Sequence, residues 1–219
     1  TLDIIRKYDD LIDFWISEKD SGLYNAMNKG ILISRGDFIG FVGSDDYLYP
    51  NTLEKIAEAS NKKSIDYTVG PVDIIEEDGK LLEKILVLPS FSSKNRFIFD
   101  MATHHLSFYI SRKIINEVKF FDENFKIRSD YDMTIKVIST YKNYYNFIDS
   151  VGAFRKGGIS GSYESYFENF YILRKHGVSI FKSILNILSS LVKVFIVKNL
   201  PLPITKFLRK RFSSGRFVK

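Results

Sequence analysis

Residues 35–46 read Arg-Gly-Asp-Phe-Ile-Gly-Phe-Val-Gly-Ser-Asp-Asp. The run from Phe38 to Val42 is almost uninterruptedly apolar, which is typical of a strand buried on both faces of a sheet. It ends at Gly43, and two adjacent carboxylates, Asp45 and Asp46, follow shortly after. Open α/β sheets bind their ligands just beyond the carboxyl ends of their strands. The stretch therefore predicts an α/β fold with a ligand site at this strand end.

The adjacent carboxylates also predict a site for Mg²⁺ or Mn²⁺. Two carboxylates crowded together repel each other unless a cation is present, and these ions prefer hard oxygen ligands when they bridge a diphosphate. Because only one of two consecutive residues can point squarely at an ion, we assign the metal contact to Asp46. The alternative is a solvated turn, since Ser and Asp are also common turn residues.

Composition limits the class of protein. The chain has 219 residues, of which 45% are hydrophobic, enough for one domain with a buried core. It contains no cysteine, which excludes a disulfide framework and a thiolate metal site and fits a reducing compartment. The first residues lack the pattern of a signal peptide, so the sequence gives no reason to expect export.

The net charge of +6 hides a division along the chain. From Phe170 onward there are 11 Lys or Arg and no Asp or Glu, whereas residues 1–169 carry 21 basic against 26 acidic residues, a net charge of −5. This division argues against nucleic-acid binding by the body of the protein. It favours a tail that meets an anionic surface.

A second block, residues 17–31, reads Ser-Glu-Lys-Asp-Ser-Gly-Leu-Tyr-Asn-Ala-Met-Asn-Lys-Gly-Ile, and its helical spacing of apolar residues predicts a helix after Gly22. Together with residues 35–46 and an acidic segment at 128–132, this block resembles the nucleotide-sugar half of family 2 glycosyltransferases. The resemblance covers residues 1 to about 160. It implies a Rossmann-like GT-A fold, a nucleotide-sugar donor, a divalent metal, and a glycan or lipid-linked acceptor. The donor-site residues that it implies are Glu18, Asp20, Asn28, Lys29 and Asp45.

The segment 128–132, Arg-Ser-Asp-Tyr-Asp, matches the place where the family carries its catalytic base at the start of a helix. Sugar transfer with inversion needs a carboxylate that accepts the proton of the acceptor hydroxyl. Asp130 fits this role. Ser129 stands where many members have Glu, which leaves Asp132 as an alternative base; Ser129 is also a good residue for a helix N-cap.

His104 and His105 lie side by side before an apolar strand. Adjacent residues on a strand face opposite ways, so at most one can point into a given cleft. The resemblance implies a role near the acceptor or donor sugar for one of these residues, without choosing between His104 and His105.

The glycine-rich basic loop at 155–162 is either a flexible turn or a lid over the donor.

Several further elements follow from local patterns. The sequence predicts a helix from about 51 to 59, a strand at 67–75 and a return strand at 81–88 joined by a turn, a helix capped by Ser111, and short strands at 144–148 and 151–154.

The N-terminal residues have the pattern of the end of a helix that, in the family, follows an opening βαβ unit. We therefore expect an N-terminally incomplete fold without the residues that hold the nucleotide base. Phe14–Ile16 is predicted to form a strand. In a 3-2-1-4 strand order, two absent strands would separate it from Phe38–Val42, so the two should not pair. The chain alone should then be poorly stable and inactive.

Residues 178–197 predict a helix with a polar stripe and a very broad apolar face, followed by basic clusters. Lysines and an asparagine within it argue against a helix that spans a membrane. The pattern favours an interfacial helix on an anionic bilayer, and the alternative is a helix that packs on the body or on a second subunit. We expect a catalytic domain at 1–169 and a basic helical tail at 170–219, peripheral at the cytoplasmic face of the cell membrane. The alternative function is a catalytically inactive, membrane-docked binding module.

Overall fold

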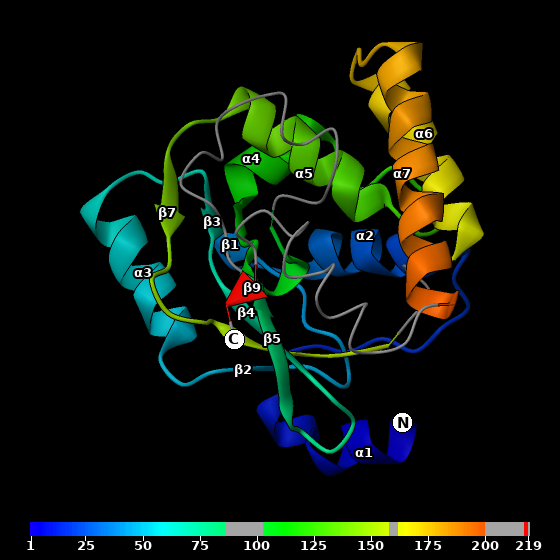
Figure 1. Cartoon of the computed structure of the whole chain (residues 1–219). Coiled ribbons are helices and arrows are strands. Elements are labelled where there is room, and N and C mark those ends of the chain that lie inside the picture. The colour runs from blue at the N-terminus through cyan, green and yellow to red at the C-terminus, as the bar shows by residue number, and fades with distance from the viewer. Residues whose placement is uncertain (86–102, 158–161, 200–216, 219) are drawn as a thin grey trace.

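The computed structural model of the chain describes residues 1–85, 103–157, 162–199 and 217–218. In this part of the chain, seven α-helices accompany two mixed sheets, with strand orders β1-β6-β3-β7 and β2-β8-β4-β5-β9 (Figure 1). The elements are α1 (Leu2–Lys7), η1 (Asp9–Leu11), α2 (Leu23–Ile33), β1 (Phe38–Ile39), β2 (Tyr47–Leu48), α3 (Thr52–Lys62), β3 (Tyr67–Val69), β4 (Val72–Ile75), β5 (Leu81–Ile85), η2 (His105–Ser107), β6 (Ile110–Ser111), α4 (Arg112–Val118), α5 (Ser129–Thr140), β7 (Tyr144–Asn146), β8 (Gly152–Arg155), α6 (Tyr163–Lys175), α7 (Ile180–Asn199) and β9 (Phe217–Val218).

Helices α2, α4, α5 and α6 share one hydrophobic core with the first sheet. In that sheet β6 pairs antiparallel with both β1 and β3, and β3 pairs parallel with β7. Val69 of β3, Val137 of α5 and Ile172 of α6 have no exposed surface. Because α6 contributes fully buried residues to this core, it belongs to the same body as the sheet.

The predicted hairpin is confirmed, with one difference. Strand β5 returns antiparallel to β4, but the outgoing strand is divided at Gly70 and Pro71. A Cβ on Gly70 would lie 2.6 Å from the Cβ of Phe147, so glycine permits a close approach there. Pro71 cannot donate to a ladder. Consequently β3 joins the first sheet and β4 the second. Residues 86–88 of the predicted return strand lie outside the described residues.

The helices predicted near 51–59 and after Ser111 are confirmed as α3 and α4. The Ser111 side chain caps α4 by accepting the backbone N–H of Ile114 at 3.4 Å. The predicted cap of α5 is wrong by one residue, because Arg128 is the N-cap and Ser129 already lies in the first turn.

The predicted strand at Phe14–Ile16 is wrong. This segment has no regular secondary structure, and Phe14 and Ile16 are 59% and 50% exposed. Strand β1 is also shorter than predicted: it covers only Phe38–Ile39, stands at the end of the first sheet, and leaves Val42 48% exposed. A strand needs hydrogen-bonding neighbours, and among the described strands β1 has one, β6. The two segments do not pair with each other, as predicted.

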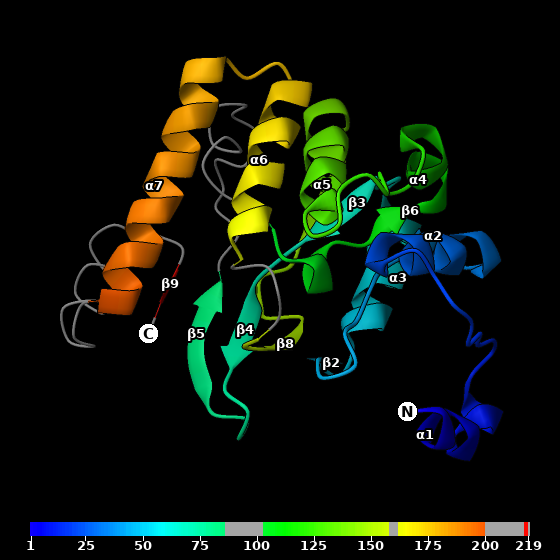
Figure 2. The same ribbon diagram turned by 90° about the vertical axis from the view of Figure 1, so that its right-hand side faces the viewer.

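Helices α6 and α7 lie side by side at one edge of the molecule (Figures 1 and 2). The predicted domain boundary at 169/170 falls inside α6, which continues through it. None of the helices in the described part of the chain combines the length and apolar character that crossing a membrane requires. Residues 200–216, which hold most of the basic clusters of the tail, lie outside the described residues.

Candidate active site

The loop after β1 folds the Asp46 carboxylate back over Gly43. A Cβ on Gly43 would lie 2.6 Å from Oδ2 of Asp46, so only glycine leaves room for the carboxylate in this position. The Asp46 side chain is 2% exposed, and its Oδ1 accepts the backbone N–H of Arg155 in β8 at 2.9 Å. Asp45, in contrast, is exposed. The two consecutive carboxylates therefore lie in different environments, with Asp46 inside and Asp45 at the surface.

The two histidines also take different positions. Nε2 of His105 lies 3.6 Å from Oδ2 of Asp46. The His104 ring lies 4.3 Å from the His105 ring, and its Nδ1 accepts the backbone N–H of Leu106 at 3.4 Å. Both rings lie against Phe154, at 4.6 Å for His104 and 5.7 Å for His105. Burial, and then the neighbouring His105, lower the pKa of His104 to about 3. The geometry therefore places His105 in contact with Asp46, and a role of either histidine near a sugar remains a prediction.

Asp130 lies in the first turn of α5. Its Oδ1 accepts the backbone N–H of Tyr131 at 2.9 Å, and the hydroxyl of Tyr24 in α2 lies 3.0 Å from the same oxygen. Burial raises the pKa of Asp130, against the opposing effects of Tyr24, Arg128 and His105. A buried carboxylate with a raised pKa is a more effective proton acceptor near neutral pH.

Asp132, the alternative base, is completely buried among two lysines and a histidine. Its carboxylate lies 2.7 Å from Nζ of Lys136, 3.1 Å from Nζ of Lys175 and 2.8 Å from Nε2 of His176. Burial alone would raise the pKa of Asp132, but hydrogen bonds from these three residues hold it far below its usual value. Asp132 therefore anchors α5 to the end of α6, and this arrangement favours Asp130 as the base.

The structure brings together two of the predicted donor residues, Glu18 and Lys29, whose side chains form an ion pair at 2.5 Å. Asp20 is exposed, and its Oδ1 accepts the backbone N–H of Gly22 at 2.9 Å, just before α2 begins. The positive φ of Gly22, 138°, suits a glycine at this turn. Lys29 lies in the second half of α2, whereas Glu18 and Asp20 precede the helix, and the contact of these side chains with a donor remains a prediction.

Asn28 has a different position from the one expected of a donor residue. It is 9% exposed, and its side chain donates to the carbonyl of Phe121 and to Oε1 of Glu123 at 3.0 and 2.8 Å. Its Oδ1 accepts the backbone N–H of Phe121 at 3.0 Å. Since all of these groups are used within the protein, Asn28 joins α2 to the loop before α5, and we do not carry it into the donor site.

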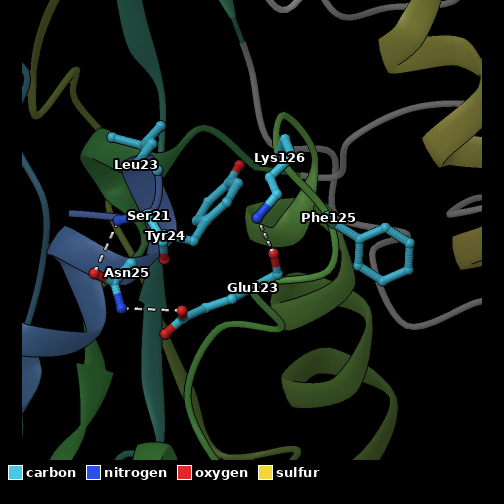
Figure 3. A pocket seen from close by; sticks show the side chains of 8 residues that line it. Ser21, Leu23, Tyr24, Asn25, Glu123, Phe125 and Lys126 are labelled. Carbon is cyan, nitrogen blue, oxygen red and sulfur yellow. Dashed lines mark hydrogen bonds between the residues drawn. The ribbon is translucent and has the colours of Figure 1, made fainter.

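A small pocket opens beside the start of α2 (Figure 3). On one side of it Asn25 donates to Oε2 of Glu123 at 3.0 Å, and on the other Nζ of Lys126 donates to the Glu123 carbonyl at 2.8 Å. Its volume of about 160 Å³ is below the 300–1,000 Å³ that is usual for a ligand site. We therefore assign no ligand to this pocket.

The residues present fit a divalent cation that a donor diphosphate would help to hold. In the described ranges, no group of three or more His, Asp or Glu side chains is arranged to hold a metal on its own. Mg²⁺ is, however, commonly bound by one or two carboxylates together with substrate phosphates. Asp46 supplies one such hard oxygen ligand, and its Oδ2 lies against the space that Gly43 leaves open.

Comparisons with known proteins place the chain in a family. The family model described as Glycosyl transferase family 2 matches residues 1–125. An uncharacterized glycosyltransferase of Methanocaldococcus jannaschii is 30% identical over 151 residues, which cover 66% of this chain and 51% of the relative. The poly(ribitol-phosphate) β-N-acetylglucosaminyltransferase TarP of Staphylococcus aureus is 26% identical over 148 residues, which cover 66% of this chain and 45% of TarP. The chain thus spans about half the length of these curated relatives.

Solved structures give the fold. The crystal structure of S. aureus TarS 1–349 in complex with UDP-GlcNAc matches 97% of this chain and 60% of that chain, with a TM-score of 0.61 at 17% identity. So low an identity shows a shared fold and nothing more, and the α/β fold described above is of the GT-A type. The family model matches more than half of the residues, and the chain therefore belongs to glycosyl transferase family 2.

Proposed function

We propose that the protein transfers a sugar from a nucleotide-diphospho-sugar donor to a glycan or lipid-linked acceptor in surface polysaccharide synthesis. The observation that carries the proposal is the Asp46 carboxylate, which accepts the backbone N–H of Arg155 at 2.9 Å and lies 3.6 Å from Nε2 of His105. Family membership supports the reaction class. The name of TarP and the UDP-GlcNAc bound to TarS make UDP and UDP-GlcNAc reasonable first probes.

In this proposal Asp46 holds Mg²⁺ or Mn²⁺, Asp45 faces the ribose or the donor sugar, and His105 lies near the transferred sugar. The cation would neutralise charge on the departing diphosphate. The protein's own part is to hold the Asp46 carboxylate in one place. The Arg155 backbone N–H and the space at Gly43 support this, because they fix the carboxylate without long side chains.

Asp130 is the proposed base of an inverting transfer. Its carboxylate accepts the proton of the acceptor hydroxyl, whose oxygen forms a bond to the anomeric carbon of the donor sugar. The bond from that carbon to the diphosphate breaks, and the nucleoside diphosphate leaves with the electron pair. Burial supports this role, because it raises the pKa of Asp130 and so favours proton uptake.

Calorimetric titration with UDP, in the presence and absence of Mn²⁺, tests the site. We expect Asp46→Asn to remove the metal-dependent part of the affinity, because an amide is a poorer ligand for a hard cation than a carboxylate. Asp37→Asn is the matched control: Asp37 precedes β1 and is exposed. Metal-dependent UDP binding that is equal in Asp46→Asn and wild type would overturn the assignment.

We also propose that the protein docks on the anionic inner face of the cell membrane through α7. Over residues 180–192, this helix turns polar side chains inward and apolar ones outward: Ser183 and Asn186 are 0% and 4% exposed, whereas Phe181, Leu188 and Val192 are 68%, 52% and 56% exposed. A helix on the surface of a soluble domain normally turns its apolar face inward. The reversed polarity supports an apolar partner outside the body of the protein.

Charge supports a bilayer as that partner. From residue 170 onward the chain has 11 basic and no acidic residues. Each Lys or Arg near an anionic surface contributes about 1 kcal/mol, and the exposed apolar face of α7 would add insertion energy. This placement corresponds to a peripheral protein on the cytoplasmic side.

Vesicle co-sedimentation tests the membrane proposal. The full-length protein should bind phosphatidylglycerol vesicles better than phosphatidylcholine vesicles, and less at high salt. The double variant Phe181→Ser, Leu188→Ser should bind several-fold more weakly, whereas Leu53→Ser, which changes a 58% exposed leucine in α3, should not. Equal binding by the double variant and wild type, or a concentration-dependent dimer lost in the double variant, would remove the membrane claim.

A further inference from the structure

One carboxylate binds three successive backbone N–H groups in the loop before α5. Oε1 of Glu168, in the middle of α6, accepts the N–H of Lys126 at 2.7 Å. Oε2 accepts the N–H groups of Ile127 and Arg128 at 2.9 and 2.8 Å. Hydrogen bonds to an ionised acceptor are roughly twice as strong as neutral ones. Glu168 therefore fixes the course of this loop.

The same loop is held from its other side by α2. The hydroxyl of Tyr24 lies 2.7 Å from the carbonyl oxygen of Ile127 and 3.0 Å from Oδ1 of Asp130. The peptide units around Ile127 are thus fixed between Glu168, which binds their N–H groups, and Tyr24, which binds a carbonyl. Since Tyr24 also contacts Asp130, a displacement of the loop would displace the environment of Asp130.

Helix α6 contacts the start of α5 a second time. At its C-terminal end, Lys175 and His176 bind the buried Asp132. Glu168 contacts the backbone just before Asp130. Lys175 and His176 contact the Asp132 side chain, just after Asp130. Asp130 therefore lies between two attachments to α6, a helix that follows the residues matched by the family model.

We propose that Glu168 is a positioning residue for Asp130, acting through the backbone of residues 126–128. It keeps the first turn of α5 in the orientation that holds the Asp130 carboxylate 3.0 Å from the Tyr24 hydroxyl. The inference rests on the proposed function for its catalytic meaning, because only that proposal makes Asp130 the base. The contact between Glu168 and the loop is independent of it.

The test compares Glu168→Ala and Glu168→Gln with the control Glu164→Gln, which removes a charge from an exposed position one turn earlier in α6. The pKa of Asp130 is measured in each full-length protein by carboxyl ¹³C NMR titration. Freeing the loop should admit water to Asp130, so we expect its pKa to fall toward the ordinary value of about 3.9 in both Glu168 variants. The control should leave it unchanged.

An Asp130 pKa equal to wild type in the Glu168 variants would overturn the inference. If Glu168→Ala does not fold, the pKa of Asp130 in Glu168→Gln decides the test, because glutamine keeps one acceptor oxygen and loses the other. A general loss of stability would not by itself lower this one pKa. Failure of the proposed function is seen separately. If an Asp130→Asn protein still transfers sugar at the wild-type rate, Asp130 is not the base, whatever the titration of the Glu168 variants shows.

Discussion

Asp130 and Asp132, two residues apart in α5, should respond in opposite ways to the same change from Asp to Asn. Asp132 is completely buried and bound by Lys136, Lys175 and His176. Removing its charge takes the carboxylate partner from Lys136 and His176, whereas Lys175 keeps Asp122 at 2.7 Å. Breaking a buried ion pair costs about 3–5 kcal/mol, and because Lys175 is 37% exposed we take the lower end, about 3 kcal/mol.

This loss can be followed by thermal unfolding. For a domain of this size 1 kcal/mol shifts Tm by about 2–4 °C, so Asp132→Asn should unfold about 6–12 °C below wild type. Asp132 has a folded-state pKa below its unfolded value, so its stabilisation is fully present above the unfolded pKa, about 3.9, and is lost as the pH falls through the folded pKa. The difference between wild type and Asp132→Asn should therefore be largest at neutral pH and shrink as the pH falls below about 4.

Asp130→Asn is the matched comparison. Burial raises the pKa of Asp130, so its ionised form destabilises the folded state at neutral pH. We expect Asp130→Asn to unfold at the same temperature as wild type or higher, while losing sugar transfer. The reasoning is refuted if Asp132→Asn keeps its Tm and abolishes transfer, because Asp132 would then be the base and not the anchor.

Three glycine substitutions give further predictions. Gly43→Ala should push the Asp46 carboxylate aside and weaken Mn²⁺-dependent UDP binding by about tenfold or more in calorimetric titration, with little change in Tm. Gly40→Ala should clash with the ring of Tyr109 and cost about 1–3 kcal/mol, seen in denaturant unfolding. Gly30→Ala, whose Cβ would meet nothing within 4 Å in the middle of α2, should stabilise the protein by about 0.4–1 kcal/mol; a loss of stability there would contradict the packing described.

Local patterns predicted much of the fold. Helix α2 after Gly22, the Ser111 cap of α4 and the turn between β4 and β5 are formed by residues close in sequence, and all three are confirmed. The strand at Phe14–Ile16 was not predictable in the same way. Apolar character indicates a strand only where a neighbouring strand supplies hydrogen bonds, and no described strand pairs with this segment.

Helix α6 was the largest element that the sequence analysis missed. Its most regular aromatic stripe, Tyr163, Phe167 and Tyr171, faces outward and is more than half exposed, while Ile172 and Leu173 are buried. Ser162 was an available signal, because its side chain accepts the N–H of Ser165 at the start of the helix. Missing α6 also meant missing Glu168.

For the candidate site, sequence spacing could name carboxylates and histidines but not their directions. The choice of His105 over His104 depends on η2, which begins at His105 and places its Nε2 3.6 Å from Asp46. The preference for Asp130 over Asp132 depends on Lys175 and His176, more than 40 residues later in the chain. Tyr24 stands within the block at 17–31, but its contact with Asp130 arises only when α2 packs against α5.

The central claim is sugar transfer with Asp130 as the base. The most direct measurement is the rate at which nucleoside diphosphate is released from a panel of UDP-, GDP- and dTDP-sugars by the full-length protein with Mn²⁺ and acceptor. This rate is compared between wild type and Asp130→Asn, and UDP affinity is measured for both proteins. We expect the rate to fall by about 10² or more while UDP affinity changes little, since a lost general base acts on the chemical step. Transfer by Asp130→Asn at the wild-type rate would contradict the account.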